Sequence, residues 1–187
     1  MSLRERKKAR TRETIRHEAL RLIDEQGYAN TTVEQIAAAS EVSSSTVFRY
    51  FPNKAALLIP DQMLEPIIEL FVAAPAELSP VAAYRYAVAQ VFEAMTGDEW
   101  GPENERQRLL YTLPEAAGAL YGQYVNTIEL ITAGLAQRLN RPGDDPELRT
   151  AAGAITGVFM ATLHGTPMTP SIILPALDFL AAGLPLS

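Results

Sequence analysis

The chain has 187 residues, of which 48% are hydrophobic, enough to bury the core of one large domain or two small ones. The absence of cysteine excludes disulfides, thiol nucleophiles and thiolate metal sites, and it fits a reducing cytoplasm. The net charge of −6 is the wrong sign for contact with a polyanion, but it is unevenly distributed: residues 1–54 carry +3 and the remainder −9.

The positive charge is concentrated at the N-terminus. Six of the nine residues from Arg4 to Arg12 are basic, which makes this stretch too polar for a secretory signal. From about Arg10 the apolar spacing predicts a helix that ends near Gly27, a residue suited to a helix C-terminus. Its apolar face consists of Ile15, Ala19, Leu22 and Ile23. The basic segment by itself is equally consistent with binding a polyanion and with a solvated tail.

Two short helices are predicted in the next segment. Thr31 and Glu34, or Thr32 and Gln35, have the spacing of a capping box, which indicates a helix start. After a turn at residues 40–42, Ser43 is a suitable N-cap for a second helix. That helix must end before Pro52, because the residue preceding a proline disfavours helical angles.

Residues 32–51 therefore have the pattern of a helix-turn-helix. Val47 and Phe51, four positions apart, are expected to face inward. The outer face of the second helix then carries small hydroxyl residues, one arginine and one tyrosine. A rod of this kind suits the major groove of DNA.

These residues resemble the DNA-binding domain of TetR-family transcriptional regulators over about the first third of the chain. The resemblance is carried by Gly27, Tyr28, Thr31 to Val33, Ile36, Ala37, Val42, Ser43, Thr46 to Phe48, Tyr50, Phe51, Asn53, Lys54 and Leu57. Ser45 departs from the glycine or small residue common in the family. The resemblance implies an all-α fold of about nine helices. It would comprise an N-terminal three-helix DNA-binding domain at residues 1–60 and a C-terminal helical ligand-binding and dimerisation domain at 61–187.

The resemblance also implies which residues contact DNA. The expected set is Thr32, Ser43, Ser44, Ser45, Thr46, Phe48, Arg49, Tyr50 and Lys54. Arg49, with Ser44 and Ser45, suits base edges, because arginine pairs with guanine through two hydrogen bonds and serine adapts to several bases. Phosphate contacts, which fix register without reading sequence, are expected of Thr32, Thr46, Tyr50 and Lys54. Phe48 either meets a thymine methyl or sugar, or packs on the first helix.

Beyond Lys54 the chain is expected to be helical, because no alternating strand pattern occurs. Pro60 and Pro66 interrupt what is commonly one long fourth helix in the resembling family, so a kink or break is expected there. Residues 74–76 are a candidate linker. Further helices are expected at residues 79–95, 103–113, 114–140, 146–164 and 170–183, with loops at 97–102 and 141–147.

Residues 61–140 contain more apolar and aromatic side chains than a spacer requires, so some are expected to line a small-molecule site. The candidate wall residues are Met63, Ile67, Phe71, Tyr84, Val88, Phe92, Leu110, Leu113, Tyr121, Tyr124 and Ile128. For most of them the alternative is simply the hydrophobic core. The segment from Arg108 is similar to the body of TetR-like regulators that sense acyl-CoA-like ligands. That similarity implies a long apolar effector whose anionic head group would meet Arg106 or Arg108.

Small residues recur every four positions on one predicted helix face, which would let another helix approach closely. The candidate homodimer interface comprises Gly153, Gly157, Val158, Ala161, Leu174 and Leu177. Dimerisation is also expected because two reading helices about 34 Å apart can read a palindrome in successive major grooves. The uncharged stretch between Arg149 and Asp178 is interrupted by glycines and prolines, so no membrane span is expected.

Other classes of function have less support. The sequence contains no phosphate-cradling glycine loop, nucleophile elbow or metal-ligand spacing, so no catalysis, metal or cofactor is expected. His17 and His164 are far apart, and His17 is expected at the surface. A helical protein-interaction domain without DNA binding and a ligand-blind regulator are the alternatives. The favoured interpretation is a cytoplasmic, homodimeric repressor of a palindromic double-stranded DNA operator, released by a small apolar effector.

Overall fold

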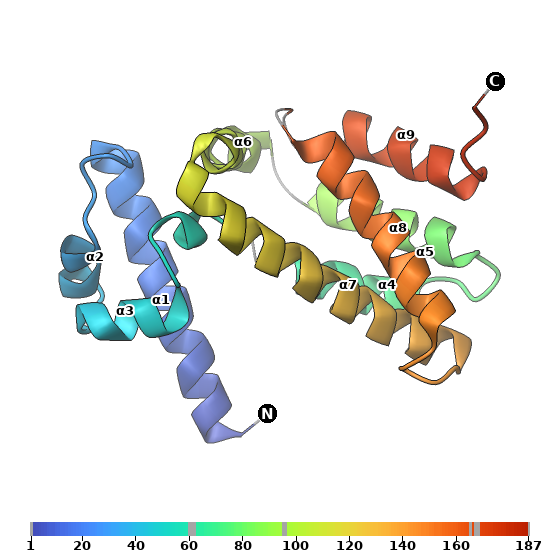
Figure 1. Ribbon diagram of the computed structural model, residues 1–187, viewed down its shortest axis with the longest axis horizontal. Coiled ribbons are helices and arrows are strands. Elements are labelled where there is room, and N and C mark those ends of the chain that lie inside the picture. The colour runs from blue at the N-terminus through green and yellow to red at the C-terminus, as the bar shows by residue number, and fades with distance from the viewer. Residues whose placement is uncertain (1, 60–62, 95–96, 165, 167–168, 187) are drawn as a thin grey trace. The chain divides into compact units, whose positions relative to one another are not determined.

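The computed structural model describes residues 2–59, 63–94, 97–164, 166 and 169–186, and the side chains of all of these except Glu5 and residues 97–103. Within that part of the chain the protein has nine α-helices, two short 3₁₀ helices and no strand, which confirms the all-α prediction (Figure 1). The helices form two compact units. The first unit comprises residues 1–59 and 115–119, and the second unit comprises residues 60–114 and 120–187.

The first unit contains α1 (Leu3–Gln26), α2 (Val33–Ala39), α3 (Ser44–Tyr50) and the 3₁₀ helix η1 (Ala55–Leu58). The predicted start of α1 at about Arg10 is wrong, since the helix begins at Leu3. The basic run consists largely of good helix formers and contains neither glycine nor proline, so nothing in it stops the helix. The predicted end is confirmed, because Gly27 follows α1 with a φ of 83°, which glycine adopts without a side-chain clash.

The core of the first unit lies where α1 meets the helix-turn-helix and η1. α2 and α3 lie along one side of α1 (Figure 1). The fully buried apolar side chains there are Ile15, Ala19, Ile36, Ala55, Leu57 and Leu58. Arg16, only 5% exposed, donates from Nε to the carbonyl of Leu57, with 3.3 Å between N and O. The long first helix therefore serves as the brace behind the two short ones.

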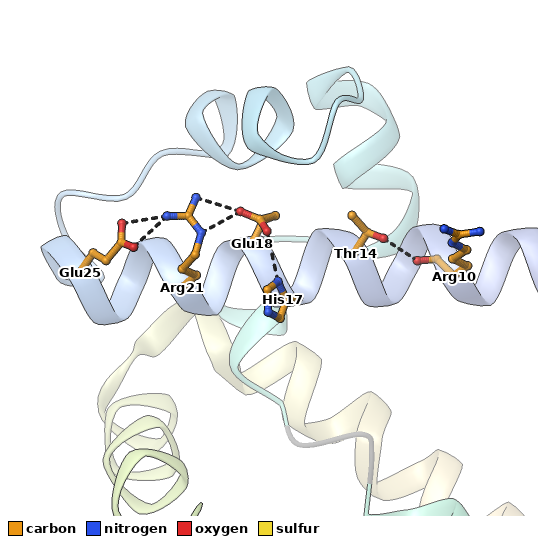
Figure 2. A network of polar contacts seen from close by, with 6 residues as sticks. All are labelled: Arg10, Thr14, His17, Glu18, Arg21 and Glu25. Atoms are coloured by element: carbon orange, nitrogen blue, oxygen red, sulfur yellow. Dashed lines mark hydrogen bonds and ion pairs between the residues drawn. The ribbon is translucent and has the colours of Figure 1, made fainter.

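The polar side of α1 carries an ion-pair network that Figure 2 shows from close by. The Arg21 guanidinium lies between the carboxylates of Glu18 and Glu25, at 2.8 Å from an oxygen of each. His17 contacts Glu18 and its side chain is 74% exposed, so the expected surface position is confirmed. Because these pairs are exposed to solvent, which screens them, they contribute little to stability.

The expected interruption of a fourth helix is confirmed. η1 ends at Leu58 and the next helix, α4 (Leu64–Ala73), starts several residues later. Pro60 lies outside the described residues. Pro66 belongs to the first turn of α4, where a backbone N–H would have no partner within the helix, so its missing donor costs nothing.

The remaining helices are α5 (Pro80–Ala94), α6 (Gly97–Thr112), the 3₁₀ helix η2 (Pro114–Ala116), α7 (Ala117–Leu139), α8 (Pro146–Leu163) and α9 (Pro170–Ala181). The loop expected at residues 97–102 is helical instead, as the start of α6. Residue 95, the expected end of the helix that begins near residue 79, lies outside the described residues.

In the second unit α5 packs against α4 and α9, and α9 packs against α8. Tyr84 of α5 is at the centre of this core, with its ring centroid 5.5 Å from that of Phe71 and 6.0 Å from that of Phe159, both edge to face. Gly134 of α7 allows a close approach to α4, because an added Cβ would lie 3.1 Å from the Phe71 ring. These aromatic contacts tie three helices into one core.

The candidate linker at residues 74–76 is held in place by Arg138 of α7. Its guanidinium donates to the carbonyls of Ala74, Pro75 and Leu78, at 2.7, 2.5 and 3.1 Å. Three backbone acceptors that lack helical partners are satisfied by one side chain. The connection between α4 and α5 is therefore a fixed turn.

Candidate nucleic-acid interface

The turn between α2 and α3 is a Schellman motif. Glu41 N–H donates to the carbonyl of Ala38 at 3.2 Å, and Val42 N–H donates to that of Ala37 at 2.9 Å. This geometry requires a left-handed residue after the helix, and Glu41 supplies it with a φ of 55°. Glycine is the usual residue there because it has no Cβ to clash. The motif fixes the angle at which α3 leaves the turn.

Both helix starts follow the predicted capping chemistry. At α2 the Thr32 hydroxyl accepts from the Gln35 N–H at 3.2 Å, and the Gln35 side chain accepts from the Thr32 N–H at 2.8 Å. At α3 the Ser43 hydroxyl accepts from the Thr46 N–H at 3.2 Å. Ser43 Oγ also lies 2.9 Å from the hydroxyl oxygens of both Ser45 and Thr46. A cluster of hydroxyls is thus held at the N-terminus of α3, the end that helix-turn-helix proteins present to base edges.

The inward face of α3 is as predicted. Val47 and Phe51 are 1% and 2% exposed, and the Arg12 guanidinium carbon lies 4.9 Å from the Phe51 ring centroid. This packing fixes the rotation of the helix about its axis, so the opposite face must point to solvent.

The outward face of α3 carries the remaining expected contact residues. Ser45 and Arg49 are exposed, and Ser44 and Tyr50 are half-buried. Phe48 is 51% exposed, so about half of its surface faces solvent. The Arg49 guanidinium carbon lies 5.4 Å from the Tyr50 ring centroid, so the tyrosine supports the arginine through a cation–π contact. Phe48 and Arg49 are therefore both presented to solvent by α3.

Lys54 has a different environment from that of an exposed phosphate ligand. Its ammonium donates to the carbonyls of Tyr28 and Thr31 at 2.8 and 2.9 Å and lies 4.0 Å from the Tyr28 ring centroid. Lys54 therefore closes the loop between α1 and α2. The phosphate contact expected of it stays a prediction.

Two further contacts of this unit were not anticipated from the sequence. Tyr28 Oη donates to the Glu115 carboxylate at 3.2 Å, and Asn53 Nδ2 donates to the Glu115 carbonyl at 2.8 Å. Burial raises the pKa of Tyr28 well above its usual value, and the hydrogen bond to Glu115 adds to this effect. The phenol is consequently a donor throughout the neutral range. Residues 115–119 thereby belong to the same compact unit as the helix-turn-helix.

The expected ligand-wall residues divide into three groups. Ile67, Phe71, Tyr84, Val88 and Phe92 form part of the main core, and Met63 and Ile128 pack against it, as the alternative interpretation held. Leu110 is buried, while Leu113 and Tyr124 are half-buried. The inclusion of Tyr121 is wrong, because its side chain is 71% exposed and so lines no buried wall.

Tyr124 has a partner that the sequence did not suggest. Its hydroxyl lies 3.1 Å from that of Tyr111 on α6, and the Tyr111 ring centroid is 5.1 Å from that of His164. Burial raises the pKa of Tyr111, and the bond to Tyr124 contributes. A pair of phenols therefore joins α6 to α7.

The expected interface residues are also divided. At Gly153 and Gly157 an added Cβ would meet nothing within 4 Å, and Ala161 is exposed, so this side of α8 is open. Leu177 is fully buried on the side of α9 that packs into the subunit core, and its assignment to a dimer interface is wrong. Val158 and Leu174 are half-buried and pack against the same core.

In the described part of the chain no three acidic, histidine or cysteine residues come together as a metal site. None of the helices described is both long enough and apolar enough to cross a membrane.

The fold and the outward face of α3 define a helix-turn-helix protein with a helical body. Residues 15–59 match the family described as bacterial regulatory proteins, tetR family, and residues 78–185 match the MftR C-terminal domain. This chain belongs to the TetR family, a family of DNA-binding transcriptional regulators, as its sequence indicated.

Individual relatives agree with this assignment. The chain is 35% identical over 140 residues to the HTH-type transcriptional regulator TcmR of Streptomyces glaucescens, a match that spans 72% of this chain and 61% of TcmR. The fold is similar to that of SmeT, the repressor of the Stenotrophomonas maltophilia multidrug efflux pump SmeDEF. That match has a TM-score of 0.53 and 22% identity over 92% of this chain and 89% of SmeT. A SmeT–triclosan complex matches with a TM-score of 0.53 and 21% identity over 92% and 90% of the two chains.

Proposed function

We propose that this protein is a cytoplasmic transcriptional repressor that binds a palindromic operator as a homodimer and is released by a small apolar ligand. The observation that carries the proposal is the outward face of α3, where Arg49 and Phe48 are exposed beside the hydroxyl cluster at Ser43. Arginine suits guanine, an aromatic ring suits a thymine methyl or a sugar, and hydroxyls suit phosphates or bases. One helix of this size makes few contacts, so two copies are needed for useful specificity.

The outer surface of the second unit supports association with a second copy. Met160 of α8 is 43% exposed, and it lies three and seven positions beyond the open Gly157 and Gly153, which places all three on one side of the helix. Phe179 of α9 is 41% exposed. Exposed apolar side chains beside small residues are typical of a surface that another helix covers. A two-fold contact between such surfaces would pair the two reading heads.

The ligand is proposed to bind beside the phenols of Tyr111 and Tyr124. They are half-buried polar groups at the junction of α6 and α7, with Leu110 buried and Leu113 half-buried on the same stretch. Apolar walls with a few hydroxyls suit a small apolar molecule. SmeT, which shares the fold, has been solved with triclosan. An acyl-CoA-like ligand would need a cation for its head group, and Arg108 is exposed but already pairs with Glu105 at 3.2 Å.

The contacts of Glu115 suggest how such a ligand would release DNA. Glu115 is in η2, three residues beyond the end of α6, and is hydrogen-bonded to Tyr28 and Asn53, which flank the helix-turn-helix. A ligand that shifts the end of α6 would therefore act on the reading head through these two bonds. Its leverage would be limited to the difference between its affinities for the two conformations.

The proposal is tested by selecting duplexes from random DNA with the purified protein and then screening apolar compounds for release. The expected result is an enriched palindrome, a complex containing two chains by light scattering, and at least one compound that lowers DNA affinity. Enrichment of no sequence above background, with a chain that is monomeric at micromolar concentration, would contradict it.

A further inference from the structure

A groove of about 570 Å³ lies in the first unit between the N-terminal part of α1 and the turn that precedes α3. From the turn it is lined by Ser40 and Val42, and from α1 by Leu3, Arg6, Lys7, Arg10, Thr11 and Thr14. The lining thus combines cations, hydroxyls and apolar side chains, and the described residues that line it include no carboxylate.

The three cations of the groove are unpaired in the described part of the chain. Arg6, Lys7 and Arg10 are exposed, and no described carboxylate lies within salt-bridge distance of any of them. Figure 2 shows the contrast with Arg21 on the same helix, whose guanidinium is held by two carboxylates. At Arg10 the bond drawn is the one from the Thr14 hydroxyl to the backbone carbonyl, and it does not involve the guanidinium. Three positive charges on one wall repel one another, and an anion in the groove would relieve that repulsion.

A second, independent observation comes from the turn. Ser40 is only 7% exposed, and its Oγ is buried without a hydrogen-bond partner among the described residues. Buried hydroxyls normally have a partner, so an unused one beside three cations indicates a missing acceptor. Serine rotates readily between staggered positions, and one of these could turn Oγ toward a bound oxygen.

The position of the groove beside α3 indicates that the anion is a phosphate of the DNA backbone. Val42 lies immediately before Ser43, the N-cap of α3, so the groove opens beside the end of the helix that enters the major groove of DNA. The groove of the duplex is bordered by sugar-phosphate strands, whose phosphates suit arginine and lysine and whose sugars suit apolar side chains. Leu3 and Val42 provide the apolar part.

We propose that this groove binds one phosphodiester of the operator strand next to the α3 contact, with Arg6, Lys7 and Arg10 as the cations and Ser40 as the hydroxyl donor. The proposal rests on the DNA binding proposed above. The N-terminal part of α1 is thereby a second contact that fixes the register of α3 on the duplex. It explains the early start of α1, since only a helix that begins at Leu3 forms the groove wall.

The test uses pairs of neighbouring lysines on the full-length protein and a duplex chosen by selection. Lys7→Ala removes a groove cation, whereas Lys8→Ala removes the same charge from an exposed position outside the groove. For Lys7→Ala we expect a several-fold lower affinity at 150 mM salt, uniform across sequences, and a salt slope lower by about 1 per reading head. For Lys8→Ala the expected change is much smaller. Equal losses for the two variants would overturn the proposal.

The Ser40→Ala variant distinguishes an effect on DNA binding from an effect on protein stability. The hydroxyl has no hydrogen-bond partner among the described residues, so its removal should leave thermal unfolding unchanged or slightly improved while DNA affinity falls several-fold. Unchanged DNA affinity in Ser40→Ala would overturn the assignment of the phosphate to this groove.

Two further arms identify the source of the phosphate. A duplex with a single neutral methylphosphonate at the bound position should bind the native protein as weakly as Lys7→Ala binds the unmodified duplex. If inorganic pyrophosphate instead binds the free protein at micromolar concentration, and Arg10→Ala abolishes this without changing the DNA salt slope, the groove belongs to a free ligand and the proposal is overturned. A different result would refute the proposed function itself: the native protein binds no DNA sequence selectively, and Arg49→Ala leaves its DNA affinity unchanged.

Discussion

The phenol oxygen of Tyr28 lies 3.2 Å from a carboxylate oxygen of Glu115, 87 positions further along the chain. Asn53 adds a second bond to the backbone carbonyl of Glu115, at 2.8 Å. Residues 115–119 are thereby part of the compact unit that carries the helix-turn-helix. In the proposed release mechanism, these two bonds would carry a change at the end of α6 to the helix-turn-helix.

Tyr28→Phe should lower the free energy of unfolding by about 0.5–1.5 kcal/mol, because one hydrogen bond to a charged acceptor is lost. It should also weaken the effect of a releasing compound on DNA affinity. Chemical denaturation measures the first and a gel shift with and without the compound measures the second. Tyr121→Phe is the matched control, since Tyr121 is 71% exposed. Equal behaviour of the two variants would remove Tyr28 from the coupling route.

Lys54→Met should destabilise the protein by about 1.5–3 kcal/mol, because two carbonyls lose a charged donor and the loop between α1 and α2 opens. Thermal unfolding is the measurement, with exposed Lys8→Met as the control. If Lys54→Met keeps native stability and only DNA affinity falls, the lysine is a phosphate ligand instead of a brace.

Glu41→Gly should raise the free energy of unfolding by up to about 1 kcal/mol. The left-handed backbone at Glu41 strains a residue with a Cβ, and glycine removes that strain. Ala38→Gly, three positions earlier in regular helix, should instead lower it by about 0.5–1 kcal/mol. Loss of stability in both variants would show that the turn is not strained.

The sequence predicted those parts of the fold that depend on local chemistry. Ser43 marks a helix start because its hydroxyl accepts a hydrogen bond from a backbone N–H of the first turn. Gly27 marks a helix end because a residue without a side chain adopts a positive φ without a clash. Val47 and Phe51 were placed correctly because helical spacing puts them on one side.

Other features could not be read from local pattern. The bond between Tyr28 and Glu115 depends on how distant segments meet, and nothing near either residue indicates it. Leu177 and Tyr121 were misplaced because apolar spacing shows that a helix has a buried side without showing which neighbour covers it. The early start of α1 was missed because a charged run can be a helix or a tail until its packing is known.

Arg138→Ala should lower the free energy of unfolding by about 1.5–3 kcal/mol, because three carbonyls of the turn between α4 and α5 lose a charged donor. Arg138→Lys should restore only part of this, since an ammonium cannot reproduce the planar fork of the guanidinium. Exposed Arg149→Ala is the control and should change stability by less than about 0.5 kcal/mol. A Lys variant as stable as the native protein would show that one point charge suffices.

The most direct test of the account is a gel shift of Arg49→Ala on the selected duplex, with Arg21→Ala as a control of equal charge change. If α3 reads the operator, Arg49→Ala should lose about 10- to 100-fold in specific affinity, corresponding to roughly 1–3 kcal/mol, while its molecular mass and helicity stay native. Arg21→Ala, whose guanidinium is held by Glu18 and Glu25, should bind almost as the native protein does. Native operator affinity in Arg49→Ala would contradict the central claim that this helix face recognises DNA.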